Sequence, residues 1–195
     1  PELVVSLRGS SSGPQIAMSP ASLDFGTVLI GCEEVQMVEI RNIGDRPLEV
    51  RNIEYNAPGG ELFLGTEGFP TLPASIDAGT ALEVPIRYAP SDDIPDFGTM
   101  RVETNDVLTR DPSASQEGIG GWESAVDSFS ADGGSVFPLS LVPADAGTIE
   151  VTVDGSVLRS GWTYDSAANA VEFDPAPSAG ADVDVEYGVQ GSCDG

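Results

Sequence analysis

The stretch that decides the fold is residues 35–53, which divides into Val35-Gln36-Met37-Val38-Glu39-Ile40, then Arg41-Asn42-Ile43-Gly44-Asp45-Arg46-Pro47, then Leu48-Glu49-Val50-Arg51-Asn52-Ile53. In the first and third parts apolar and polar side chains alternate, which is the period of a β-strand with one buried face. The middle part favours a turn, since Asn42 and Asp45 can bond nearby backbone and Gly44 accepts tight conformations. The stretch therefore predicts two neighbouring β-strands joined by a tight turn.

The same alternation continues on both sides of these two strands. Further strands are expected at residues 16–18, 23–25, 81–88 and 99–103, with turn residues such as Asp77-Ala78-Gly79 between them. Several short strands separated by turns at about ten-residue spacing are typical of an all-β sandwich. We therefore assign residues 14–108 to a β-sandwich, preceded by an N-terminal segment at residues 1–13.

A second β-domain is expected in the last third of the chain. Residues 109–134 show little periodicity and contain Asp111-Pro112 and Gly120-Gly121, so we interpret them as a linker. Strand patterning resumes at residues 136–141, 148–153, 156–158, 162–164, 170–173 and 183–187, and Asp154-Gly155 is a hairpin signal. Residues 135–195 therefore predict a small β-module, and the fold class of the whole chain is all-β.

The charge composition excludes several classes of function. The chain has 195 residues, of which 32 are acidic and 8 are basic, so its net charge is −24. All eight basic residues are Arg and there is no His. Ser-His-Asp and Cys-His nucleophiles, imidazole metal ligands and Schiff-base lysines therefore cannot form. We expect no catalytic residues, no nucleic-acid partner because the surface repels phosphate, and no membrane insertion because no apolar run reaches about 18 residues.

Residues 19–106 resemble the ASH-type (abnormal-spindle/Hydin-like, or choice-of-anchor D) domains. The matching motifs are Ser19-Pro20, Ser22-Leu23-Asp24-Phe25-Gly26, the stretch from Ile40 to Leu48, Ala78-Gly79 before Leu82-Glu83-Val84, and Ile86-Arg87-Tyr88-Ala89-Pro90. The resemblance implies an immunoglobulin-like sandwich related to the major-sperm-protein fold. In such domains this fold serves adhesion or assembly rather than catalysis.

The second half resembles a β-module at the C-terminus of some myxobacterial-type cell-surface proteins. The matching positions are Phe137-x-Leu139, Ile149-x-Val151, Gly161-Trp162-Thr163-Tyr164-Asp165, Asn169-x-Val171-x-Phe173 and Val183-x-Val185-x-Tyr187. There it follows ASH-like and von Willebrand factor A-type domains. We expect no A-type domain in this chain, so the ligand-binding role of such a domain does not carry over.

ASH repeats end with a strand of the form apolar-x-apolar-x-Leu-x-Gly, and this strand does not follow Asp106. A good copy stands instead at the N-terminus, as Leu3-Val4-Val5-Ser6-Leu7-Arg8-Gly9. A sandwich that lacks one strand exposes an apolar groove and unpaired backbone groups. We therefore expect residues 1–9 of one copy to complete the sandwich of the next by β-strand addition. The expected donor residues are Leu3, Val4, Val5, Ser6 and Leu7, and the expected acceptor groove is lined by Ile16, Met18, Val84, Ile86, Tyr88, Met100 and Val102.

Three alternatives to donation between copies stay open. The N-terminal strand could fold back into its own domain. It could instead be the last strand of a preceding repeat. Residues 183–191 could also supply the missing strand after a long insertion.

The two cysteines and the acidic clusters carry weaker expectations. Cys32 and Cys193 form an even pair, which in an extracellular setting suggests a disulfide, within one chain or between two. Acidic residues cluster at Asp92-Asp93 with Asp96, at Asp106 with Asp111, and at Asp182 with Asp184. Such clusters leave calcium as a weak possibility, but none matches a known calcium loop. We expect no metal site and no cofactor.

The sequence therefore predicts an extracellular or cell-surface structural subunit. It assembles head-to-tail with copies of itself into a filament or surface appendage, through the N-terminal donor strand. A head-to-tail contact that does not close into a ring makes an open filament. The alternative is a monomeric adhesin or carbohydrate-binding module of a larger cell-surface protein.

Overall fold

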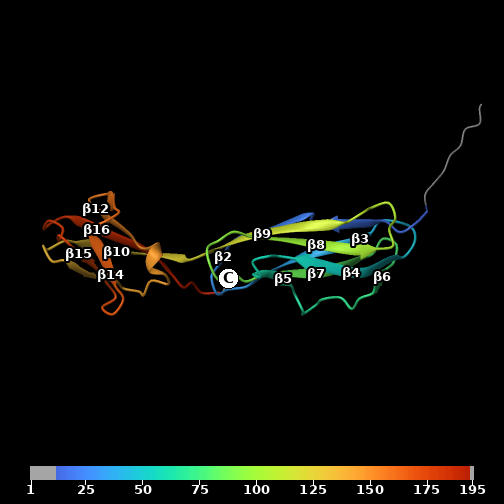
Figure 1. Ribbon diagram of the computed structural model, residues 1–195, viewed down its shortest axis with the longest axis horizontal. Helices are drawn as coiled ribbons and strands as arrows, with labels where there is room; N and C mark the ends of the chain where they lie inside the picture. The colour runs from blue at the N-terminus through green and yellow to red at the C-terminus, as the bar shows by residue number, and fades with distance from the viewer. Residues whose placement is uncertain (1–11, 194–195) are drawn as a thin grey trace, which may run out of the picture. The chain divides into compact units, whose positions relative to one another are not determined.

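The computed structural model describes residues 12–193 and divides the chain into two compact units. Within the described range, unit 1 comprises residues 12–28 and Cys32–Gly120, and unit 2 comprises Leu29–Gly31 and residues 121–193. Both units consist of β-strands, as Figure 1 shows. The expected all-β fold class is confirmed. The expected donor residues Leu3, Val4, Val5, Ser6 and Leu7 lie outside the described residues.

Unit 1 is a sandwich of two sheets. Sheet A has the strand order β1-β3-β7-β5, and sheet B has the order β2-β9-β8-β4-β6. The strands of sheet A are β1 (Ile16–Ser19), β3 (Glu34–Asn42), β7 (Ala81–Tyr88) and β5 (Leu62–Leu64). Those of sheet B are β2 (Ser22–Leu29), β9 (Ser113–Gly121), β8 (Asp96–Thr104), β4 (Leu48–Asn56) and β6 (Ala74–Ile76). This is the immunoglobulin-like sandwich that the ASH resemblance implies.

The core of unit 1 lies between the two sheets and follows the alternation of the sequence. Val38 and Ile40 of β3 and Val84 and Ile86 of β7 are fully buried. Their neighbours Met37 and Glu83 point to the outer face of sheet A and are exposed. A strand places successive side chains on opposite faces, so this alternation fixes the register of each strand against the core.

The turn between β3 and β4 is closed by one buried amide. Asn42 accepts hydrogen bonds from the backbone N–H of Gly44 (3.0 Å) and of Gln15 (3.4 Å), and its Nδ2 donates to the carbonyl oxygens of Arg46 (2.7 Å) and Ile76 (2.9 Å). A Cβ atom at Gly44 would lie 2.2 Å from the carbonyl oxygen of Gly13, so only glycine fits. The expected turn at Asn42-x-Gly44 is confirmed, and it leads from β3 in sheet A to β4 in sheet B.

The expected linker at residues 109–134 is wrong, because two strands occupy it. β9 pairs antiparallel with β8, with Met100 opposite Ala114 and Gly98 opposite Gln116. β10 (Glu123–Ser130) pairs with β16 (Asp182–Val189) in unit 2. The first domain therefore extends to Gly120 and includes its own closing strand.

Unit 2 also has two sheets. Sheet C has the order β10-β16-β12-β13 and sheet D the order β11-β15-β14. The remaining strands are β11 (Val136–Pro138), β12 (Glu150–Val153), β13 (Ser156–Leu158), β14 (Trp162–Asp165) and β15 (Ala170–Phe173), with a 3₁₀ turn η1 (Ala146–Thr148) before β12. Asp154 (φ 48°) and Gly155 (φ 75°) form the β12–β13 turn, so the expected hairpin is confirmed.

Aromatic side chains hold the core of unit 2 together. The rings of Phe137 and Phe173 meet edge to face at 5.2 Å between centroids, and Tyr187 is 1% exposed. Trp162 packs against this core and its Nε1 donates a 2.9 Å hydrogen bond to the carbonyl oxygen of Leu158. The space beside the Cα of Gly188 is filled by Trp122, whose Cβ lies 2.7 Å from where a Cβ on that glycine would stand.

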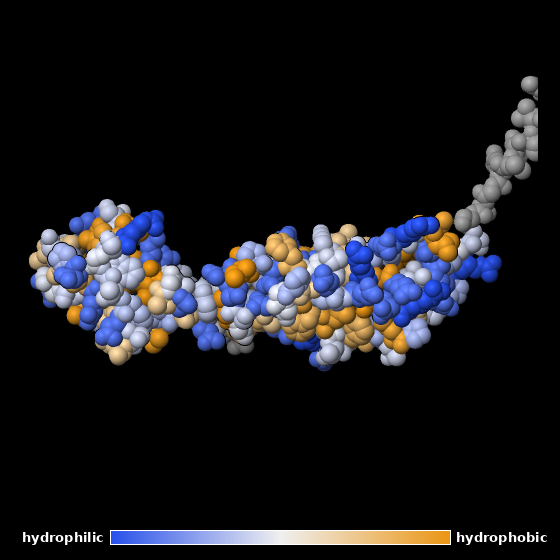
Figure 2. Space-filling view, viewed as in Figure 1, coloured by the Kyte–Doolittle hydropathy of each residue, from blue (hydrophilic) through white to orange (hydrophobic). Residues whose placement is uncertain are grey.

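Polar and charged residues are spread over the visible surface of both units, with hydrophobic residues between them (Figure 2). Among residues 12–193, no helix is long and apolar enough to cross a membrane.

Candidate functional site: the closing strand of unit 1

The closing strand β9 is the candidate site, because the sequence predicted a vacancy where this strand lies. Its inward positions carry Ala114, Gln116, Gly118 and Gly120. None of them is a large apolar side chain, which explains why the alternation was not visible in the sequence. The motif that could have revealed the strand is Gly118-x-Gly120, at the place where the ASH pattern ends in glycine.

The expected open acceptor groove is wrong for the same reason. Of its expected residues, Ile16, Val84, Ile86, Tyr88, Met100 and Val102 are buried in the core of unit 1, and Met18 is partly buried against that core. Met100 lies on β8 opposite β9, and the N–H of Val102 donates to the carbonyl oxygen of Pro112 just before β9. β9 therefore covers the place where the groove was expected.

The side chain of Gln116 on β9 is buried in the core with incomplete hydrogen bonding. This side chain is 2% exposed, and its Nε2 donates to the carbonyl oxygen of Ala114 at 3.0 Å. Its Oε1 and the nearby hydroxyl of Tyr55 are both buried without a hydrogen-bond partner among the described residues. A Cβ at Gly98 would lie 3.2 Å from that Oε1 and 2.6 Å from that hydroxyl, so both polar atoms crowd over the same glycine. Each buried polar atom left unpaired costs about 1–3 kcal/mol.

The inward residues of β9 are mostly small, and the side chain of Tyr88, on β7 of the opposite sheet, fills the space beside them. A Cβ at Gly118 would lie 2.6 Å from Cε1 of Tyr88, so the ring packs directly on the glycine backbone. The ring is held on one side by Phe25, with centroids 5.5 Å apart. On the other side its hydroxyl donates to Oδ2 of Asp96 at 3.2 Å. Burial and the neighbouring carboxylates raise the pKa of Tyr88 far above that of a free tyrosine.

Two carboxyl groups meet beside this tyrosine. Burial, together with the interaction with Glu61, raises the pKa of Asp96. Burial alone would raise the pKa of Glu61 as well, but its bonds with Ser91 and its interaction with Asp96 outweigh burial and lower it. Asp96 itself lies opposite Gly118 in the ladder between β8 and β9.

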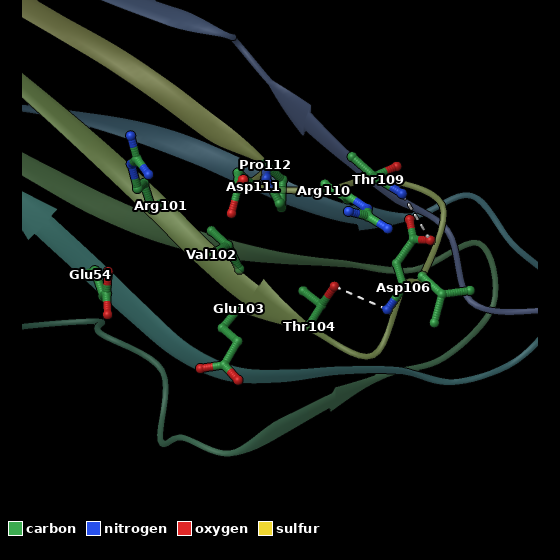
Figure 3. A pocket seen from close by; sticks show the side chains of 11 residues that line it. Glu54, Arg101, Val102, Glu103, Thr104, Asp106, Thr109, Arg110, Asp111 and Pro112 are labelled. Carbon is green, nitrogen blue, oxygen red and sulfur yellow. Dashed lines mark hydrogen bonds between the residues drawn. The ribbon is translucent and has the colours of Figure 1, made fainter.

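A surface groove of about 660 Å³ lies where the β8–β9 loop leads into β9 (Figure 3). Its charged side chains are Glu54, Arg101, Glu103, Asp106, Arg110 and Asp111. The carboxylate of Asp106 serves the backbone, since it accepts from the N–H groups of Ile16 (3.0 Å), Leu108 (2.8 Å) and Thr109 (3.3 Å). Acidic residues outnumber arginines here, so the groove does not attract an anion.

The three acidic clusters of the sequence lie in different places and do not combine into one site. Asp106 and Asp111 line the groove, Asp92 and Asp96 lie near Glu61, and Asp184 accepts a hydrogen bond from Ser128 in unit 2. Between residues 12 and 193, no group of three or more His, Cys, Asp or Glu side chains is arranged to hold a metal ion.

Cys32 and Cys193 are both disulfide-bonded, which confirms the expected disulfide. Disulfides form and persist in oxidising compartments, so this bond is typical of a protein outside a reducing cytoplasm.

Comparison with known proteins gives similarity at the level of solved structures only. No protein-family model and no curated protein matches the chain. The VesB protease of Vibrio cholerae aligns with 54% of this chain and 32% of its own, at 9% identity and a TM-score of 0.45. A Porphyromonas gingivalis protein of unknown function aligns with 57% of this chain and 49% of its own, at 18% identity and a TM-score of 0.45. The ASH/PapD-like domain 7 of human CEP192 aligns over 62% of this chain and 97% of its own length, at 17% identity and a TM-score of 0.42. The chain thus spans about a third to a half of the first two proteins.

Proposed function

We propose that this chain is a non-catalytic extracellular structural subunit that assembles head-to-tail with copies of itself by exchanging a β-strand. In this proposal the N-terminal segment of one copy displaces β9 of the next and takes its place in sheet B. The sequence alone suggested that the donated strand enters an open groove. Here the donated strand must instead displace β9. The observation that carries the proposal is the polar, small-residue inner face of β9.

The N-terminal sequence can be aligned with β9 and carries larger apolar residues at two of the inward positions. When Gly9 is aligned with Gly118, Leu7 falls at Gln116 and Val5 falls at Ala114. The incoming strand therefore brings two larger apolar side chains to the core and removes the unpaired Oε1 of Gln116. Burial of a large aliphatic side chain contributes about 1.5–3 kcal/mol. β9 acts as a placeholder, and the difference between the two strands drives the exchange.

The match fits a strand from another copy and not the chain's own N-terminus. Ser12 and Gly13 donate hydrogen bonds to the carboxylate of Asp45. Gly13 also lines a groove together with Leu108, so this part of the chain lies at the end of unit 1 that carries the β8–β9 loop (Figure 1). Gly118 lies six residues beyond Pro112, about 20 Å along the strand at about 3.3 Å per residue. The three peptide units from Gly9 to Ser12 span at most about 11 Å. In this register the donor must come from a second copy.

The test is the assembly state of the full chain and of a variant without residues 1–9. We expect the full chain to form elongated particles in negative-stain images and the shortened chain to remain monomeric on a sizing column. Because the net charge is −24, assembly should be faster in 1 M than in about 0.15 M NaCl. A full chain that stays monomeric under both conditions, after incubation long enough for strand displacement, would reject the proposal.

The variant Gln116→Leu tests directly whether displacement of β9 is the assembly step. This substitution makes β9 a better occupant of its own place, so we expect a more stable monomer and slower assembly. Glu117→Leu is the matched control, since position 117 faces outward on the same strand. Equal assembly rates for both variants would show that displacement of β9 is not the assembly step.

A second candidate function is supported by the completeness of the sandwich. Because β9 already closes unit 1, the chain can also stand as a monomeric adhesin or carbohydrate-binding module of a larger surface protein. Residues 1–9 would then close a preceding sandwich of the same kind. A monomeric full chain that binds a specific glycan on an array would favour this function over self-assembly.

A further inference from the structure

Gly118 lies directly over the ring of Tyr88. Any strand that takes the place of β9 therefore has little room for a side chain at this position. A Cβ there would stand 2.6, 2.8 and 3.1 Å from three ring atoms of Tyr88. Such distances require one partner to move. The ring cannot move freely, because Phe25 packs against it, Asp96 accepts from its hydroxyl, and the residue is 0% exposed.

We infer that Tyr88 sets the register of the exchanged strand, by admitting only a strand that carries glycine in place of Gly118. This inference rests on the proposed function and names the residue that gives it specificity. The N-terminal segment has one such glycine within its apolar alternation, Gly9, two residues after Leu7. A shift of two residues along the strand would place Leu7 or Ser11 against the ring.

The next inward position limits where the donated strand ends. A Cβ at Gly120 would lie 1.9 Å from the backbone oxygen of Asp92, and the residue of the N-terminal segment that falls there is Ser11. The donated strand therefore leaves the sheet after Ser10. This exit places Gly9 as the last inward residue of the donor, directly over Tyr88.

The test compares Gly9→Val with Ser10→Val in the full chain. Both variants add the same side chain at adjacent positions, but position 10 falls at Ile119, which faces outward and already tolerates a branched residue. We expect Gly9→Val to slow assembly at least tenfold and Ser10→Val to assemble at the rate of the unmodified chain. A Gly9→Val chain that assembles as fast as Ser10→Val would overturn the inference and leave strand donation intact.

A second variant tests the role of Tyr88 directly. We expect Tyr88→Leu to restore assembly to the Gly9→Val chain, because the smaller side chain makes room for the added atoms. Circular dichroism and a sizing column establish that the Tyr88→Leu protein is folded before assembly is measured. If it does not fold, Gly9→Ala takes its place, with an expected rate between those of the unmodified and Gly9→Val chains. No rescue in a folded double variant, or no graded effect of Gly9→Ala, contradicts the role of Tyr88.

If the unmodified chain itself does not assemble, the proposed function fails and this inference fails with it.

Discussion

The hydroxyl of Tyr187 on β16 donates a 2.7 Å hydrogen bond to Oδ2 of Asp127 on β10, inside unit 2. The same carboxylate oxygen accepts from the N–H of Ser140 at 2.8 Å, and the N–H of Leu141 donates to the tyrosine oxygen at 3.1 Å. One buried phenol thus joins two strands and the segment that follows β11. Sequence alternation placed Tyr187 on the same strand face as Val183 and Val185 but gave no sign of this partner.

Tyr187→Phe should destabilise unit 2 by about 1.5–3 kcal/mol, because it removes a hydrogen bond to a charged group and leaves the carboxylate less satisfied. Calorimetry of the full chain measures the loss. Tyr164→Phe is the matched control, since its hydroxyl bonds the neutral amide of Asn169 at 2.8 Å. Its expected cost is about 0.5–1.5 kcal/mol. Equal losses in both variants would contradict a special role for Asp127.

The acid dependence of unit 2 should follow Asp127. Burial alone would raise the pKa of Asp127, but the bonds from Tyr187 and Ser140 outweigh it and hold the pKa below its usual range. The stabilisation from this carboxylate is therefore present above the ordinary pKa of an aspartate and is lost as pH falls through the lowered value. Tyr187→Phe should move the pKa of Asp127 upward, which an NMR titration of the carboxyl carbon detects. An unchanged titration would show that Tyr187 does not stabilise the ionised form.

Asp96→Asn should stabilise unit 1 at pH 7 and have a smaller effect near pH 4. The raised pKa of Asp96 means that the folded protein favours its protonated form. Its contribution is thus present below the ordinary aspartate pKa and is lost as pH rises through the raised value. The amide removes the repulsion with Glu61 and can still accept from Tyr88. Calorimetry at both pH values, with the exposed Asp93→Asn as control, checks this prediction, and a larger gain at pH 4 would contradict it.

Asn42→Ala should destabilise unit 1 by about 2–4 kcal/mol. The truncation leaves the carbonyl oxygens of Arg46 and Ile76 and the N–H of Gly44 without their partner, at about 1–3 kcal/mol for each group that stays buried. Asn52→Ala, at an exposed position on β4, should change the stability by less than about 0.5 kcal/mol. Urea denaturation of both variants measures the difference. Similar midpoints for the two would mean that Asn42 does not hold the turn.

Glu150→Thr should stabilise unit 2 by a few tenths of a kcal/mol at low salt. Glu150 on β12 lies directly opposite Glu186 on β16, and like charges at opposed positions destabilise a sheet by about 0.2–1 kcal/mol. The gain should shrink in 1 M NaCl, where exposed charges are screened. Glu172→Thr is the control, because Val136 and Thr163 lie opposite position 172. A gain that persists in 1 M NaCl would point to strand propensity instead of charge.

The strands with large alternating side chains could be predicted from the sequence, and the others could not. β3, β4, β7 and β8 lie where alternation predicted them, because their inner faces carry valine, isoleucine, leucine or methionine. β9 was missed because its inner face is alanine, glutamine and glycine, and the bulk that fills the core at this point belongs to Tyr88 on another strand. β10 was missed because its inner face includes Asp127, whose partner Tyr187 lies 60 residues away. In both cases the missing information is a contact distant in sequence.

The sequence thus predicted a vacancy beside β8, and β9 fills that place. The comparison of residues 1–9 with the ASH pattern pointed to the place of the closing strand. It did not show that a polar strand fills that place, since hydrophobic patterns identify strands by what they bury. The unpaired atoms of Gln116 and Tyr55 become visible only when β9, β8 and β4 are seen together.

The packing of Trp122 on Gly188 and of Trp162 on the core of unit 2 has a practical consequence. The chain contains two tryptophans, and both belong to this unit. Indole emission therefore reports the melting of unit 2 alone, whereas tyrosine emission also includes Tyr55 and Tyr88 of unit 1. A single fluorometer can thus follow the two units as separate optical signals in one unlabelled sample.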